Sequence, residues 1–203
     1  MKKISIAVLV VIASFSVIFL SKGEENMTAN INLILKAAKE TYLIGDEINL
    51  TYTFLNENDH SIYLLPWGGH YTTNWIVAYN EQDVKLADLP LVRYEIKFIP
   101  LKEDFVFIGP KKSYSITIKG KVIKSEFSRF DRKDQKKYKG FFIDFNNSAI
   151  FLEKSGDFTI KAFYDGKTEW RDKGKELYGL NNILVGKLES NEIKIIIKNK
   201  RNN

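Results

Sequence analysis

The densest group of side chains suited to binding lies in residues 66–75, which read PWGGHYTTNW. Aromatic faces grip sugars or extended peptides at a low cost in conformational entropy, and neighbouring glycines let a ligand approach the backbone. The segment therefore predicts a ligand-binding loop with Trp67, His70, Tyr71 and Trp75 as its contacts. Because large aromatic side chains are usually mostly buried, the alternative is that both Trp are core residues at strand ends.

A second candidate is the strongly basic segment of residues 121–139, which contains eight basic and three acidic side chains. A segment of this charge is attracted to anionic surfaces such as phospholipid headgroups or acidic cell-wall polymer. The alternative is a charged loop that is merely solvated. The basic-surface candidates are Lys124, Arg129, Arg132, Lys133, Lys136 and Lys137.

The residue types required for most catalytic sites are scarce. The chain has no Cys and two His, His60 and His70, so it offers no thiol nucleophile, no disulfide framework and no helical His pair for a zinc peptidase. It also lacks the G-x-S-x-G motif of hydrolases and the calcium loop of an EF-hand. These patterns predict a protein that is not an enzyme and that holds neither a metal nor a cofactor.

Short strands must position the candidate residues. Residues 47–56 alternate apolar and polar side chains with strict period two, and residues 157–164 repeat the pattern, which is typical of strands with one buried face. No helical period is convincing, and residues 165–168 are predicted to form a hairpin turn. Further strands are predicted at residues 32–38, 62–65, 75–79, 92–98, 113–119 and 192–198, the last of them at a sheet edge.

This organisation predicts an all-β, immunoglobulin-like antiparallel sandwich of two sheets. The basic segment interrupts the strand rhythm, so it is predicted to be a long insertion loop at about residues 120–150, anchored by the aromatics that follow it. The predicted core consists of Leu33, Leu35, Ile48, Leu50, Tyr52, Phe54, Phe158, Ile160, Ala162 and Ile195.

The N-terminus resembles an export signal, with Lys2 and Lys3 before an apolar run that ends at Leu20. We expect residues 1–23 to be a cleaved signal peptide, or alternatively an uncleaved membrane anchor, and residues 24–203 to form a single exported domain, secreted or periplasmic. Without residues 1–23 the chain keeps 28 basic and 25 acidic side chains. This near balance argues against a nucleic-acid partner.

The order of motifs resembles one known family. Residues 42–56 (YLIGDEINLTYTFLN) resemble the opening of many secreted immunoglobulin-like domains. Downstream, Trp67, Pro100, the run Ile108-Gly109-Pro110 and residues 156–160 (GDFTI) follow the order of the N-terminal, non-catalytic domain of peptidyl-Lys metalloendopeptidases. A weaker resemblance exists to the bacterial intracellular proteinase inhibitor family. Both resemblances imply a β-sandwich that associates with peptidases. Residues 121–146 are an insertion relative to that pattern, and the peptidase half is missing.

Three functions are therefore considered, and the third of them is an unrecognised enzyme. The first is a non-catalytic exported binding module of the envelope or secreted space, with a protein or carbohydrate partner or a peripheral contact with an anionic envelope surface. The second is a proteinase inhibitor or stand-alone pro-domain-like regulator, in which a loop or a sheet edge blocks a secreted peptidase. Contact with a membrane core is expected only through an uncleaved N-terminal segment.

Overall fold

Two packed β-sheets form the body of the structure, as the alternation of apolar and polar residues predicts. The computed structural model describes residues 30–66, 74–90, 99–130, 135–145 and 148–199. The described elements are β1 (Ile31–Ala37), β2 (Thr41–Leu43), β3 (Glu47–Asn56), β4 (Ile62–Leu64), β5 (Asn74–Tyr79), β6 (Asp88–Pro90), η1 (Lys102–Asp104), β7 (Val106–Ile108), β8 (Ser113–Phe130), β9 (Gln135–Asp144), β10 (Ser148–Phe151), β11 (Gly156–Gly166), α1 (Thr168–Tyr178), β12 (Gly186–Glu189) and β13 (Ile193–Lys198).

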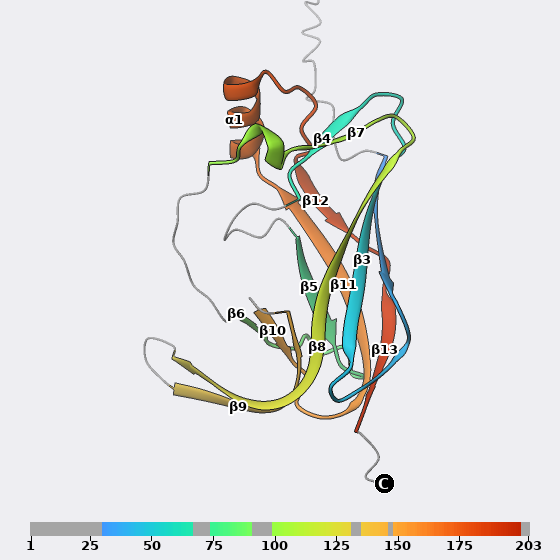
Figure 1. Ribbon diagram of the computed structural model, residues 1–203, viewed down its shortest axis with the longest axis vertical. Coiled ribbons are helices and arrows are strands. Elements are labelled where there is room, and N and C mark those ends of the chain that lie inside the picture. The colour runs from blue at the N-terminus through green and yellow to red at the C-terminus, as the bar shows by residue number, and fades with distance from the viewer. Residues whose placement is uncertain (1–29, 67–73, 91–98, 131–134, 146–147, 200–203) are drawn as a thin grey trace, which may run out of the picture.

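The larger sheet has the strand order β1-β3-β8-β9-β10-β6, and all of its pairs are antiparallel. The smaller sheet is centred on β11, which pairs with β5 along one edge and with β12 and then β13 along the other. The two sheets face each other across the core, and β4 and β7 form a small separate ladder near one end (Figure 1). The prediction of an all-β antiparallel sandwich is confirmed.

The predicted core is also confirmed. All ten residues named from the alternation are at most 5% exposed, and they belong to one cluster that both sheets contribute to. Phe54 of β3 meets Tyr164 of β11 edge to face, with ring centroids 5.4 Å apart. Because the inward positions of both sheets are apolar, burial of this surface supplies the main stabilising term of a chain that has no disulfide.

Two side chains in the turn between β12 and β13 join the sheets at one edge. The amide of Asn191 pairs with the backbone of Leu35 in β1, accepting from its N–H at 2.9 Å and donating to its carbonyl at 3.1 Å. Next to it, Ser190 Oγ accepts the N–H of Ala162 in β11 at 2.9 Å. Asn191 thus makes the two hydrogen bonds to Leu35 that a neighbouring strand would otherwise make, and it holds the edge of β1 against the smaller sheet.

A buried asparagine organises the loops at the far end of β3. Asn56 is fully buried, and its Nδ2 lies 2.9, 3.2 and 3.0 Å from the carbonyl oxygens of His60, Ile108 and Gly109. Its Oδ1 accepts the backbone N–H and the side-chain amide of Asn58. One fully buried amide therefore satisfies backbone groups in two loops.

The sequence pattern gives no indication of the helix α1. Residues 165–168 were predicted to be a hairpin turn, but Thr168 begins a helix that ends in a left-handed Gly179, whose N–H donates to the carbonyl of Lys175 at 3.0 Å. Its buried residues are Trp170 and Gly174, which pack in a small cluster with Phe105 and Ile183. So narrow a buried face leaves little helical periodicity in the sequence.

The expectation that the last strand lies at a sheet edge is wrong. The strand β13 lies between β11 and β2, and β2 adds to it in parallel, with Ile197 opposite Tyr42. The three-residue β2 is too short to show an alternation, so its pairing could not be read locally. The predicted strand at residues 92–98 and the N-terminal residues 1–23 lie outside the described residues. Among the described helices, none is long and apolar enough to cross a membrane.

Replacing Asn56 with alanine should lower the free energy of unfolding by about 3 kcal/mol, because carbonyl groups in two loops lose a fully buried donor. The change is measured by urea denaturation followed by tryptophan fluorescence. The control is Asn32→Ala, which removes an exposed amide that contacts Glu57, and its expected cost is below about 1 kcal/mol. Equal losses in the two variants would contradict the organising role of Asn56.

Stability should fall at alkaline pH because of two core tyrosines. Burial raises the pKa of Tyr52 and of Tyr164 far above the ordinary phenol value of 10.0. Stability is therefore full below about pH 10, where both states are protonated, and declines above it, where only the unfolded state ionises. Each phenol contributes at most about 1.4 kcal/mol per pH unit to this decline. Melting temperature against pH should fall less steeply for Tyr52→Phe, and an unchanged slope would contradict the prediction.

Candidate functional site

The basic segment forms a two-stranded β-ribbon that extends beyond the sandwich (Figure 1). We call it the basic ribbon: residues 121–130 of β8 pair antiparallel with residues 135–144 of β9. The prediction of an insertion loop at about residues 120–150 is therefore wrong. The charge of the segment is typical of a solvated loop, but its β-branched and aromatic residues favour strands, and the backbone groups of alternate residues in each strand pair with those of the other.

The base of the ribbon is held by aromatic packing on both faces. On one face Tyr138 and Phe142 meet Phe151 of β10, with ring centroids 5.2 and 5.1 Å apart. On the other face Val122 and Ile143 are buried in the main core. The sequence-based expectation that the aromatics behind the basic segment anchor it is confirmed, since Phe141 and Phe142 are at most 6% exposed.

Two glycines permit the close contacts that this anchoring requires. A Cβ on Gly140 would lie 2.4 Å from the backbone oxygen of Glu153, in the turn that precedes β11. A Cβ on Gly120 would lie 2.7 Å from the ring of Phe145 and 2.9 Å from the backbone oxygen of Asp144. Both positions lie where the ribbon leaves the sandwich, so the absence of a side chain lets other residues pack directly on the strands.

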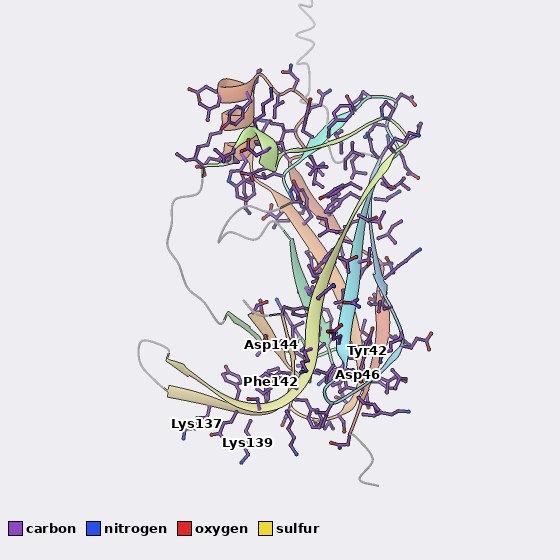
Figure 2. The ribbon with its side chains drawn as sticks, viewed as in Figure 1. Tyr42, Asp46, Lys137, Lys139, Phe142 and Asp144 are labelled. Atoms are coloured by element: carbon purple, nitrogen blue, oxygen red, sulfur yellow. The ribbon has the colours of Figure 1, made fainter. Side chains whose placement is uncertain are left out.

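The exposed part of the ribbon displays lysines on one face. The register places Lys124 opposite Phe141 and Glu126 opposite Lys139, and side chains of directly opposed residues share a face. Lys137 precedes Lys139 by two residues in β9, so it lies on the same face. Lys124, Lys137 and Lys139 are exposed. Figure 2 shows Lys137 and Lys139 pointing away from the ribbon on its convex side, whereas Phe142 lies on the concave side. We call this set of three lysines the lysine face.

Contacts within the lysine face leave it basic. Glu126 Oε2 lies 4.0 Å from Lys139 Nζ, and the two side chains are 49% and 81% exposed, so water screens the pair. The ammonium of Lys124 lies 5.9 Å from the centre of the Phe141 ring. Packing on a ring holds the cation in place without neutralising it. The ribbon therefore presents three positive charges on a backbone that is stiffened by pairing.

The predicted basic-surface residues are placed only in part. Lys124 and Lys137 come together on the lysine face, as the register requires. The register also pairs Arg129 with Lys136, but the side chains of both lie outside the described residues, as do Arg132 and Lys133 altogether.

The predicted aromatic loop lies largely outside the described residues. Trp67, His70 and Tyr71 lie outside the described residues. Trp75 lies in β5, where its backbone pairs with Phe163 of β11, but its side chain also lies outside the described residues. Whether Trp67 and Trp75 are core or contact residues remains a prediction.

Lys139 and Glu126 belong to the site but were not singled out from the sequence. A signal was available, because Lys137 and Lys139 flank the apolar Tyr138, and Lys124 and Glu126 flank Ser125 with the same period of two. That alternation predicts one charged face on each strand. The strand pairing, which brings the two charged faces together, could not be read from either strand alone.

Comparisons with known proteins do not assign a function to the basic ribbon. Neither a scan against protein-family models nor a search of curated proteins finds a match to the chain. Within the described residues, no group of three or more His, Cys, Asp or Glu side chains is arranged to hold a metal ion. The candidate site is therefore argued from the ribbon itself.

Replacing Gly140 with alanine should destabilise the base of the ribbon by about 2 to 3 kcal/mol, because the new methyl group overlaps backbone that cannot move freely. The matched control is Gly109→Ala, where the nearest atoms to a Cβ lie at ordinary contact distances of 3.6 and 3.9 Å. Urea denaturation measures both free energies of unfolding. If the two variants lose the same stability, the close approach at Gly140 does not anchor the ribbon.

Proposed function

We propose that this chain is an exported, non-catalytic binding module that contacts an acidic protein partner through the basic ribbon. The observation that carries the proposal is the display of Lys124, Lys137 and Lys139 on one face of an anchored strand pair. A flexible loop would lose conformational entropy when it binds, whereas a paired ribbon has already lost most of that entropy on folding. Charge on a stiff scaffold also orients the partner and accelerates association.

Export is supported by the sequence of residues 1–23, with its basic start and apolar run. A protein that works outside the cytoplasm without disulfides depends on its core for stability, and the main cluster of buried residues is extensive. The resemblance to non-catalytic domains of peptidyl-Lys metalloendopeptidases is compatible with a module that binds a protein partner. This part of the proposal is tested by N-terminal sequencing of the secreted chain, which should begin near Glu24.

Reversing the charge of the lysine face tests the binding role. The variant Lys124→Glu/Lys137→Glu/Lys139→Glu should bind fluorescent poly-L-glutamate at least about a hundredfold more weakly than the unmodified chain at low salt, since each cation contributes roughly 1 kcal/mol. Raising the salt concentration should weaken binding of the unmodified chain, because exposed charges are screened. Fluorescence anisotropy measures both effects.

The matched control is Lys36→Glu/Lys102→Glu/Lys175→Glu, which changes the net charge equally at exposed positions of β1, η1 and α1. It should retain most of the affinity. An equal loss in both variants would mean that the probe senses net charge alone, and the ribbon would then not be the binding face.

A second candidate function is regulation of a secreted peptidase, and the same variants test it when peptidase activity is measured. That candidate is favoured by the projection of a stiff strand pair, since extended segments occupy the substrate clefts of peptidases. A regulator would slow a secreted metallopeptidase at stoichiometric amounts, and the ribbon variant would lose that effect whereas the control variant would keep it.

A further inference from the structure

One turn shows which backbone groups of β8 point outward along the free-standing part of the basic ribbon. Where β8 leaves the sandwich, Val122 N–H donates to the carbonyl of Asp46 at 2.9 Å, and its carbonyl accepts the N–H of Gly45 at 2.7 Å. Gly45 and Asp46 form the turn between β2 and β3, so Val122 directs its backbone toward the β3 side of β8. Backbone groups of alternate residues in a strand point the same way.

The next residues with this direction are Lys124 and Glu126, followed by Ser128 and Phe130. The pairing of β3 with β8 ends at Glu47 and Lys121, while the register of β8 with β9 continues without interruption to Phe130 and Gln135. Among the strands that the structure describes, β9 alone pairs with β8 beyond Val122, and it lies on the opposite edge. The outer edge of β8 from residue 123 onward thus presents a row of backbone donors and acceptors.

We propose that this outer edge binds an extended acidic peptide segment of a partner protein as an added strand of the ribbon. The inference rests on the proposed function, because it names the part of the partner that the ribbon binds and the manner of binding. Backbone hydrogen bonds to Lys124 and Glu126 supply affinity that does not depend on side chains, and the lysine face selects the charge of the peptide.

The charge of an incoming strand determines whether it can pair with this edge. Lysines on an edge strand normally prevent other chains from adding to it, because an incoming neutral or basic strand leaves the cation uncompensated. An acidic strand removes that obstacle, since its carboxylates lie next to Lys124 and within reach of Lys139 and Lys137. A second copy of the chain is disfavoured, because residues 121–139 carry a net charge of +5 in each copy.

The anchoring of the ribbon makes the edge suitable for strand addition. An isolated hairpin is marginally stable and would have to be ordered when the peptide binds. Here the aromatic contacts of Tyr138 and Phe142 with Phe151, together with the turn that closes on Val122, hold the ladder before the partner arrives. The entropy lost on binding is therefore mainly that of the peptide.

The test uses a fluorescent synthetic peptide of about eight residues, with Glu alternating with Thr, and two N-methylated forms of it. One form carries N-methyl groups at the odd positions and the other at the even positions. Both keep every charge, but each loses the backbone donors of one edge. Strand addition predicts that one form binds the full-length mature chain at least about tenfold more weakly than the other.

A second comparison removes the donor from the protein. Glu126→Pro and Glu126→Gln delete the same charge, but only proline also removes the outward N–H, and proline is tolerated where that N–H faces away from the ladder. We expect Glu126→Gln to bind the peptide at least as tightly as the unmodified chain, and Glu126→Pro to bind several-fold more weakly than Glu126→Gln. Amide exchange at Lys124 and Glu126 should slow when the unmodified peptide binds.

The outcomes separate the inference from the function on which it rests. If both N-methylated forms bind equally while the lysine-face variant still loses affinity, binding is electrostatic and strand addition is wrong. Equal loss in the lysine-face variant and its charge-matched control would overturn the proposed function itself. Self-association of the free chain in sedimentation, or binding to vesicles of anionic phospholipid with none to the peptide, would also overturn the inference, because the edge or the lysine face would then have a different occupant.

Discussion

The long strand β8 pairs with β3 over its first half and with β9 over its second half, and this change of partner supports the basic ribbon outside the sandwich. The two partners lie on opposite edges of β8, and Lys121 pairs with both Glu47 and Asp144. Since the strand continues through this point, the ribbon inherits its position from the sheet. Gly120 leaves room at the junction for the ring of Phe145 to lie against the strand. A loop could not transmit the rigidity of the core in this way.

Two kinds of interaction share the task of closing the fold. Apolar burial between the sheets supplies the driving force, as the fully buried rings of Phe54 and Tyr164 illustrate. Amide side chains then specify how the loops and edges meet. The buried Asn56 satisfies carbonyl groups in two loops, and the exposed Asn191 completes the edge of β1. An apolar side chain at either position would leave backbone groups without partners, so these amides contribute specificity as well as stability.

The ribbon combines local stiffness with a surface chemistry unlike that of the core. Its base is aromatic on one face and part of the main core on the other, whereas its outer half carries exposed lysines. Positive charges on such a scaffold keep fixed spacing along the strand, so they can match charges on an extended partner more selectively than a flexible basic tail. The arrangement gives a physical basis for the proposed binding role, which the charge of the segment alone could not define.

The sequence by itself determined the strands with strict alternation and the core they build, because the inward and outward directions of side chains along a strand depend only on a local period of two. Residues 47–56 and the ten predicted core positions follow from that period. Only the tertiary structure decided that residues 121–139 form a ribbon, that β2 lies beside β13, and that Lys139 joins Lys124 and Lys137 on one face. Strand pairing joins residues far apart in the chain, and neither its register nor its partner is encoded in either strand alone.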